Sequence, residues 1–369
     1  MKHHADNVSW KFHWLTNWDE IWEKGFVDKW KEWLDCSPTA HVFFHPALVR
    51  AWVETYQPIR ALTPYFMLAS SGAHSIFLPL VLWKRNWKNG FQRLLIPAGY
   101  SEFDYHDPIL TGPADSFDWL SFWGAFERQI VRRPPVRFDR AQLDGIRRIF
   151  SGRGTSWNEA DMCPFADVSI FKGSEEYLSS LKASLRGDLR RQSRRMAEVG
   201  QTEFVVFSHD QREMALNEIG PFLTAHTKRW PHAYKTPRLH ANIVESALPA
   251  GLLHFSALKI GGKTAAWHLG FVYQDRFYYY LPAQEEAHEK LSPGKVLLLK
   301  CVEDAIARGL KIFDHLRGEE NYKAGWTDKK ELLCTYRSNS QWPFSRMRNM
   351  AIDRLRPRLL AGWRRARNE

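Results

Sequence analysis

Residues 291–326 read LSPGKVLLLKCVEDAIARGLKIFDHLRGEENYKAGW, and the fold prediction starts from this stretch. It opens with Ser292, a potential helix cap, followed by proline and glycine, as at many helix starts. Four apolar residues then recur at helical spacing, and Gly309 is placed to end the helix. The segment 311–316 reads as a short strand, and a polar loop follows it. The predicted order is therefore loop, helix, turn, strand and polar loop. The apolar residues of the helix are Val296, Leu299, Val302 and Ile306.

The start of this predicted helix suits an anion. The first N–H groups of a helix lack intrahelical partners and carry partial positive charge. A glycine lets a phosphate approach the backbone closely. Gly294 and Lys295 are therefore candidates to hold a pyrophosphate, while ordinary helix capping is the alternative interpretation.

The whole stretch resembles GNAT-superfamily acyltransferases of the CelD/FemAB-like type. Those proteins show an S-P-G-x-x-L loop before a helix, and then a strand with an aspartate that runs into R-G-x-x-x-Y-K and a tryptophan. The resemblance extends more loosely from Phe44 to Arg337. The matching residues are Ser292, Pro293, Gly294, Leu297, Asp314, Arg317, Gly318, Tyr322, Lys323 and Trp326.

One feature of the familiar GNAT pattern differs. The usual pyrophosphate loop has the form Q/R-x-x-G-x-G/A, whereas this chain has Lys290-Leu291-Ser292-Pro293-Gly294. The donor that the resemblance implies is therefore either a coenzyme A thioester or another activated acyl group.

Composition narrows the class of protein. The chain has 369 residues, enough for two or three domains, and a formal charge of +11. A basic balance favours anionic partners: phosphorylated donors, nucleic acid or acidic membrane surfaces. Four cysteines lie far apart without a Cys-x-x-Cys pair, which argues against a zinc ribbon or a disulfide framework. No His, Cys or carboxylate group has metal-ligand spacing, so no metal is predicted.

The N-terminus lacks a signal peptide's apolar core, and no apolar run reaches the ~20 residues of a membrane span. We therefore expect a cytoplasmic protein.

Residues 1–160 are expected to form a first lobe with a Trp-rich helical start. Its most polar stretch is Gly99–Asp107, which crowds three carboxylates, a histidine and two tyrosines into nine residues. The stretch either binds substrate through Asp104 and Tyr105, with Asp107 as a general base, or caps a strand as a polar loop. The resemblance favours the first interpretation, since related acyltransferases carry an Asp-Tyr-x-Asp-like segment in this lobe.

Residues 161–342 are expected to form the second lobe, which carries the donor loop. It begins with a long basic helix over 174–200, whose arginines either face solvent or contact phosphates. Three strands with tight turns at Gly261-Gly262 and Gln274-Asp275 follow. The basic tail 343–369 either packs on the body or lies on the acidic inner face of a membrane, and Pro357 limits a straight helix there.

The fold class expected from these elements and the resemblance is α+β, with two GNAT-like lobes in tandem. Each lobe is expected to be a mixed, mostly antiparallel sheet flanked by helices. The resemblance implies transfer of an acyl group to an amine or hydroxyl of a small-molecule, sugar or cell-envelope acceptor. No tightly bound cofactor is expected, and acyl-CoA or aminoacyl-tRNA is the co-substrate.

Each candidate site residue has an expected role. Asp314 or Asp107 takes the acceptor's proton, and Tyr322 protonates the leaving group. Donor contacts are expected from Ser292, Gly294, Lys295, Tyr280 and Leu281. Substrate contacts are expected from Asp104, Tyr105, His268, Arg317, Lys323 and Trp326. An ionised Asp314 in an otherwise apolar strand needs a partner, and Arg317 and Lys323 are the nearest cations in sequence, with His315 adjacent. Asp314 therefore either pairs with one of them and holds the loop, or faces the cleft as the base.

Two alternatives remain open. FemAB-like relatives use aminoacyl-tRNA as donor, and the basic helix would suit an RNA backbone. In a different class, a GNAT lobe without chemistry would bind polysaccharide, RNA or a lipid surface.

Overall fold

The computed structural model describes residues 9–86, 90–132, 134–147, 157–231, 236 and 238–365, without the side chains of 159, 160 and 355–365. The chain divides into two compact units, one of residues 1–49, 56–160 and 333–369, the other of residues 50–55 and 161–332. Residues 333–342, expected in the second lobe, thus group with the first unit. The reason is that β15 (Lys330–Asn339) pairs antiparallel with β8 (Arg140–Ile146).

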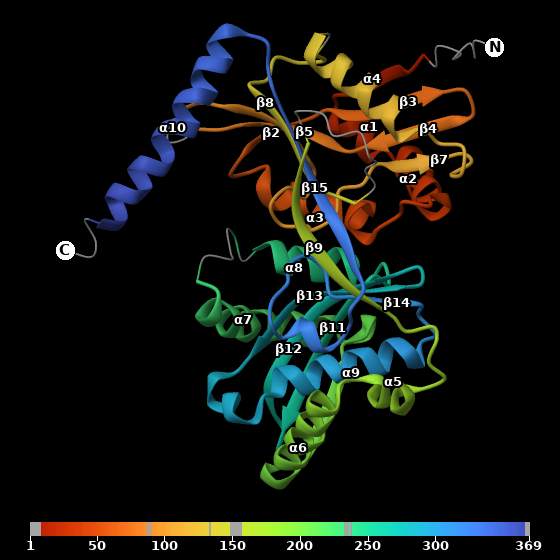
Figure 1. Ribbon diagram of the computed structural model, residues 1–369, viewed down its shortest axis with the longest axis vertical. Helices are drawn as coiled ribbons and strands as arrows, with labels where there is room; N and C mark the ends of the chain where they lie inside the picture. The colour runs from red at the N-terminus through yellow and green to blue at the C-terminus, as the bar shows by residue number, and fades with distance from the viewer. Residues whose placement is uncertain are drawn as a thin grey trace. The chain divides into compact units, whose positions relative to one another are not determined.

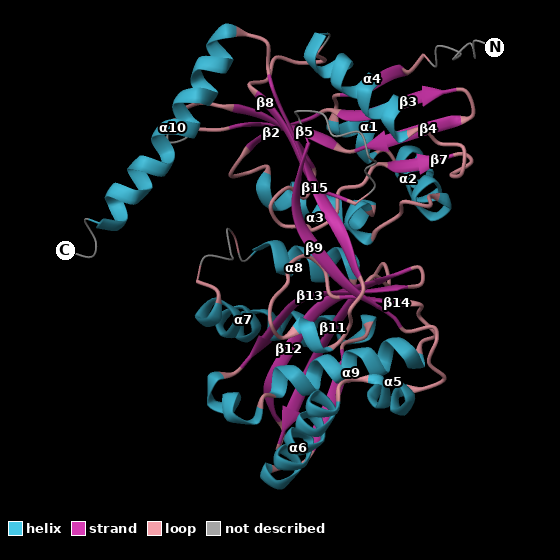
Figure 2. Ribbon diagram, in the orientation of Figure 1, coloured by secondary structure: helices cyan, strands magenta, loops and turns pink. Residues whose placement is uncertain are grey.

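The first unit contains two sheets and several helices (Figures 1 and 2). One sheet has the order β1-β3-β4-β7, and its pairs are antiparallel. The other runs β15-β8-β6-β5-β2 within this unit, and β6 and β8 are parallel. The further strands are β1 (Lys11–Leu15), β2 (Ala61–Pro64), β3 (Phe66–Ser71), β4 (His74–Leu78), β5 (Leu80–Lys84), β6 (Arg93–Pro97) and β7 (Ile109–Thr111). The helices are α1 (Trp18–Trp22), α2 (Lys24–Cys36), α4 (Trp119–Arg132) and α10 (Pro343–Arg365), and α3 (Pro46–Tyr56) contributes its two ends to this unit and residues 50–55 to the other.

The Trp-rich start of the chain packs as a core element, as its helical spacing predicts. Trp30 of α2 is fully buried. Its ring meets Phe66 and Phe77 edge-on, with centroids 5.7 and 5.1 Å apart. Such aromatic pairs stabilise beyond their buried area.

The second unit is one mixed sheet with helices on both faces (Figure 1). Its strand order is β10-β11-β12-β13-β14-β9, and β13 and β14 are parallel. The strands are β9 (Trp157–Asp167), β10 (Thr202–Val206), β11 (Leu253–Ile260), β12 (Lys263–Tyr273), β13 (Arg276–Gln284) and β14 (Ile312–Asp314). The helices are α5 (Ser174–Ser180), α6 (Ala183–Val199), α7 (Arg212–Arg229), α8 (Arg238–Ala247) and α9 (Pro293–Ala307).

Alternation along β11 assigns the two faces of this sheet. Phe255 points to α7, where its ring lies 5.7 Å from that of Phe222. Its neighbour Ser256 points the other way, to Cys301 of α9. Helices α7 and α9 therefore cover opposite faces.

Both predicted tight turns are present. Gly261 and Gly262 have φ values of 56° and 79°, and Gln274 has a φ of 51°, as two-residue hairpin turns require. The helix expected over 174–200 is instead two helices, because the chain is extended at Leu181 and Lys182.

The start of the tail packs on the first unit. Buried Asp139 accepts hydrogen bonds from Ser345 and Arg348 of α10, and its carbonyl accepts one from Asn349. The backbone of α10 continues through position 357, where a break was expected. The side chains of Leu355, Leu359 and Trp363 are outside the described part of the chain. Within the described ranges, no helix of 18 or more residues is apolar enough to span a bilayer.

Candidate acyl-donor site

The parallel pairing of β13 with β14 stops early. Their register runs only from Arg276↔Ile312 to Tyr278↔Asp314, whereas β13 continues to Gln284. On its other side, β13 stays paired with β12 as far as Gln284. Residues 279–284 therefore form an edge that extends beyond the end of β14. Such an edge can pair with an extended chain.

This edge also contains a proline, which strands tolerate where a ladder is open. The carbonyl of Pro282 accepts a hydrogen bond from Nδ1 of His226 on α7, at 2.9 Å. Tyr280 and Leu281, two expected donor-binding residues, lie on the same edge and are half-buried.

Helix α9 begins close to the end of β13, and its first turn is capped in an unexpected way. Ser292 is the N-cap residue, but its side chain makes no cap hydrogen bond, and its φ and ψ are both 50°. The Gly294 N–H instead donates to Oε1 of Gln284, at 3.2 Å. The prediction of a serine side-chain cap was therefore wrong, because the last residue of β13 supplies the acceptor.

The expected phosphate contacts at this helix start are partly occupied. The N–H of Lys295 donates to the Ser292 carbonyl, and its ammonium pairs with Asp188 of α6. The hydrogen bond from Lys295 lowers the pKa of Asp188 below its ordinary value. A Cβ at Gly294 would lie 2.8 Å from Oε1 of Gln284. The helix start can thus meet an anion when the flexible Gln284 side chain moves.

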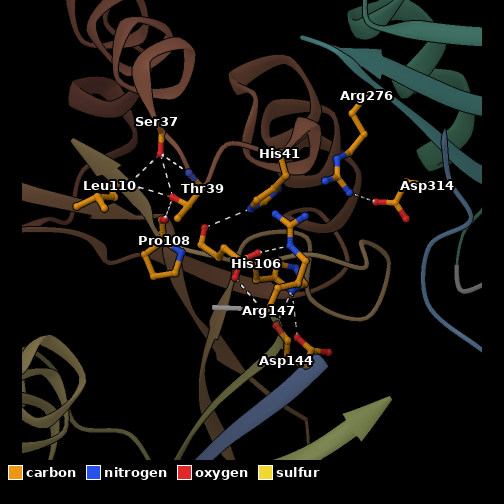
Figure 3. A network of polar contacts seen from close by, with 11 residues as sticks. Ser37, Thr39, His41, His106, Pro108, Leu110, Asp144, Arg147, Arg276 and Asp314 are labelled. Atoms are coloured by element: carbon orange, nitrogen blue, oxygen red, sulfur yellow. Dashed lines mark hydrogen bonds and ion pairs between the residues drawn. The ribbon is translucent and has the colours of Figure 1, made fainter. Parts of the chain in front are cut away.

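Asp314 lies at the end of β14 with its carboxylate fully engaged in structural contacts. The side chain is buried, and Oδ2 accepts from Arg276 at 2.7 Å (Figure 3). Oδ1 accepts from the N–H of Leu316 at 2.8 Å. Leu316 has a φ of 59°, so this bond holds a left-handed residue in place. Asp314 is thus ion-paired, as the structural interpretation requires, but with Arg276 of the neighbouring strand, a residue that this interpretation did not include.

The loop after Asp314 is held mainly by Lys323. Its buried ammonium lies 2.8 Å from the Arg317 carbonyl and near those of Leu316 and Gly318. It also pairs with Glu320 at 2.8 Å. Lys323 therefore closes the loop, and this arrangement argues against a role in substrate binding.

The remaining residues of the motif divide between core and surface. Trp326 is buried in the core of the second unit, and its carbonyl accepts from the Tyr177 hydroxyl. Half-buried Tyr322 packs against the same core. Exposed Arg317 pairs with Asp161 at 3.0 Å.

His268 is fully buried and faces α9. Its ring stacks on Tyr279 at a centroid distance of 4.1 Å, and burial lowers its pKa well below the ordinary value. It is a core residue, so the expected cleft-lining role is not supported by its position.

The polar stretch of the first unit also takes part in a network of polar contacts (Figure 3). Asp107 is fully buried and accepts two hydrogen bonds from Arg147, at 2.6 and 2.7 Å. Burial alone would raise the pKa of Asp107, but the charge of Arg147 and its hydrogen bonds lower it below the ordinary value. Arg147 also lies over the ring of buried Tyr105, 4.1 Å from its centroid. A carboxylate held in this way is a weak base.

Neighbouring contacts fix the same stretch. The Asp104 carbonyl approaches Gly145 so closely that a Cβ there would lie 2.1 Å away. Thr39 donates to the Pro108 carbonyl at 2.6 Å (Figure 3). Among the two interpretations of this segment, these contacts favour the structural one.

The sequence did not predict three residues that hold the site together: Gln284, Arg276 and Asp188. Their contacts depend on strand register and on the packing of one helix against another, and these cannot be read from local spacing. A strand that ends in a glutamine just before a helix-start loop is the only local signal that singles out Gln284.

Part of this chain matches a known protein family, and most of it superposes on solved structures. Residues 183–324 match the model of an acetyltransferase (GNAT) domain. No curated protein matches the chain. The crystal structure of FemX superposes with a TM-score of 0.57 at 10% identity, covering 85% of this chain and 94% of that one.

Two further solved structures are similar in fold. A conserved protein of unknown function from Bacteroides thetaiotaomicron has a TM-score of 0.50 at 11% identity, over 84% of this chain and 96% of that one. The C-terminal domain of a putative lysylphosphatidylglycerol synthetase from Agrobacterium fabrum has a TM-score of 0.49 at 13% identity, over 84% and 91%.

The α+β class with mixed sheets is therefore as predicted, and the fold is that of FemX over most of the chain. The match of residues 183–324 to a GNAT acetyltransferase domain supports the resemblance of this chain to the GNAT acyltransferases of the CelD/FemAB-like type.

Proposed function

We propose that the second unit transfers an acyl group from an acyl-CoA-type thioester to an amine or hydroxyl of a small-molecule, sugar or cell-envelope acceptor. The observation that carries this proposal is the early end of the β13–β14 pairing. It leaves residues 279–284 beside the start of α9, so that one ligand can contact both. The donor's extended arm pairs with the β13 edge, and its phosphates lie at the positive end of the helix.

The reaction needs little from the protein beyond positioning. The acceptor nitrogen or oxygen attacks the thioester carbonyl carbon, the C–S bond breaks, and the acceptor's proton passes to solvent water. Backbone N–H groups at the β13 edge would stabilise the oxyanion. The contacts of Asp314 and Asp107 make each a structural residue in this proposal. Tyr322, half-buried beside the loop, remains our candidate to protonate the leaving thiolate.

Gln284→Glu tests the donor site. The added carboxylate would lie beside the Gly294 N–H at the start of α9. A negative charge at a helix start stabilises the helix, but it repels a phosphate. We therefore expect an unchanged or slightly higher melting temperature, with coenzyme A affinity weakened roughly tenfold or more in calorimetry.

Gln211→Glu is the matched control. Gln211 forms a capping box with Ser208 in the same unit, where glutamate is an equivalent residue. This variant should bind coenzyme A like the wild type. Equal affinity in the wild type and in Gln284→Glu would remove the start of α9 from the donor site.

An aminoacyl-tRNA donor is the second candidate, and helix α6 is the observation that favours it. Exposed Arg190 and Arg194 lie one turn apart on α6 and line a groove of about 530 Å³. Neither guanidinium has a polar partner within the described residues, and like charges at this spacing destabilise a helix. The phosphates of an RNA backbone would neutralise the charges of the two arginines.

Identifying whether the purified protein retains coenzyme A or RNA separates the two donors. A protein that binds neither and transfers nothing is the non-catalytic alternative.

A further inference from the structure

A polar cluster lies inside the apolar core of the second unit. His254 comes from β11, His268 from β12 and Cys301 from α9, and all three side chains are buried. Ser256, also buried, lies next to Cys301. His254 and Ser256 are close together on β11, but His268 and Cys301 come from other elements, so no local spacing reveals the cluster. The register of β11 with β12 places Ser256 opposite His268, on the face that α9 covers.

The separations within this cluster suit one small metal ion. One ligand atom from each of His254, His268 and Cys301 lies within 4.8 Å of the others. The Cys301 Sγ lies 3.7 Å from His268 Nδ1 and 3.7 Å from Ser256 Oγ. Zinc bonds of ~2.0–2.3 Å in a tetrahedron place neighbouring ligand atoms roughly 3.3–3.8 Å apart. Both measured separations fall within that range.

The cluster also contains a ring nitrogen that has no hydrogen-bond partner. Within the described residues, this is Nδ1 of His254, whose other ring nitrogen contacts Asp304. The surroundings of both histidines are aromatic, since Phe277 lies 4.7 Å from the His254 ring and 5.6 Å from the His268 ring, centroid to centroid. A buried polar atom without a partner is costly, and a bound ion removes that cost by coordinating the atom.

Asp304 provides the outer contact that metal-binding histidines commonly have. Its Oδ2 lies 3.0 Å from Nε2 of His254, one helical turn after Cys301 on α9. A carboxylate in this position orients the imidazole and increases its basicity toward a metal.

We propose that His254, His268 and Cys301 bind one zinc ion in the core of the second unit, with the Ser256 hydroxyl as the fourth ligand. Imidazole and thiolate are the ligands that zinc prefers. Binding converts the Cys301 thiol to a thiolate and releases one proton to solvent. A closed, four-ligand site is structural, so the ion would tie α9 to β11 and β12. This inference does not depend on which acyl donor the unit uses.

Metal analysis of the purified full chain tests the site directly. We expect about one zinc per chain from zinc-supplemented growth, measured by plasma mass spectrometry. Replacement by cobalt should produce the absorption bands of a tetrahedral, thiolate-bound ion. Added zinc should raise the melting temperature of chelator-treated protein.

Substitutions of the proposed ligands, compared with a control cysteine, test where the ion binds. Cys301→Ser and His268→Asn should lose the zinc and the cobalt–thiolate band, whereas Cys36→Ser, at the exposed cysteine, should keep both. The proposal is overturned if folded wild type reconstituted with zinc retains no stoichiometric ion. It is equally overturned if Cys301→Ser retains as much zinc as the wild type. In either case the cluster is a neutral thiol–imidazole contact.

Discussion

At the scale of single residues, Asp314 connects a neighbouring strand to the loop that follows it. Its two carboxylate oxygens hold Arg276 of the adjacent strand and the N–H of Leu316, which adopts a left-handed conformation. Removal of one member of a buried ion pair leaves the other charge uncompensated. Asp314 can therefore be essential for the stability of the second unit without touching a substrate.

Asp314→Asn is expected to lower the melting temperature and to destabilise the second unit by about 2–4 kcal/mol. The amide is nearly isosteric, but it loses the charge that neutralises Arg276. Chemical denaturation measures the loss, and transfer activity per folded molecule should stay near the wild-type value.

Asp275→Asn is the control for this prediction, because its ion pair with Lys311 is exposed and such pairs contribute little to stability. A normally melting Asp314→Asn protein with transfer activity roughly 100-fold lower would contradict the structural role and restore Asp314 as the base.

The need of Asp314 for a partner could be foreseen from sequence, because an ionised carboxylate in an apolar strand is costly when unpaired. The identity of the partner could not. Arg276 is brought to Asp314 by the parallel register of β13 and β14, and register depends on the whole sheet. For the same reason, neither the Gln284 cap nor the Lys295–Asp188 pair could be read from local spacing.

At the scale of elements, local patterns located the helices and strands well where a turn or period marks them. The β11–β13 meander was predictable from its two tight turns, which contain residues with positive φ. The break between α5 and α6 was missed because the amphipathic period runs through it. The arginines of α6 were predicted either to face solvent or to contact phosphates, and exposed Arg190 and Arg194 are compatible with both.

Charge reversal on α6 tests whether that pair binds phosphates. Arg190→Glu/Arg194→Glu should weaken tRNA binding and make its salt dependence shallower by roughly 1–2 in log–log slope. Fluorescence anisotropy at several salt concentrations measures both quantities.

The double variant Lys172→Glu/Lys263→Glu, at exposed lysines of the same unit, makes an equal change in net charge elsewhere. Equal weakening in the two double variants would assign the effect to net charge rather than to the groove on α6.

At the scale of the whole molecule, the α+β class with mixed sheets could be predicted, because it follows from the order of the elements and from the resemblance. The sequence did not predict that the chain returns to the first unit after residue 332. That return depends on the pairing of β15 with β8, which joins segments far apart in sequence.

Buried histidines in both units make stability depend on pH. Burial, and then the charge of Arg147, lowers the pKa of His41 to about 3. Burial, and then the charge of Lys323, lowers the pKa of His315 to about 3, and neither ring nitrogen of His315 has a hydrogen-bond partner within the described residues. These rings stay neutral in the folded protein at pH values where the unfolded chain protonates them.

The sign of the pH effect follows from proton binding. Between the unfolded pKa of ~6.5 and the folded value, the unfolded chain binds one more proton per histidine, so the free energy of unfolding falls as pH falls. Each histidine contributes up to ~1.4 kcal/mol per pH unit in this window.

His315→Phe removes one ionisable group and places an aromatic ring beside Phe313, whose centroid lies 5.0 Å from that of His315. We expect a flatter dependence of unfolding free energy on pH between 4 and 6, measured by denaturant titration. His209→Gln, at an exposed histidine, should leave the slope unchanged. A His315→Phe slope equal to that of the wild type would mean that His315 is protonated in the folded protein, with water or a carboxylate reaching its ring.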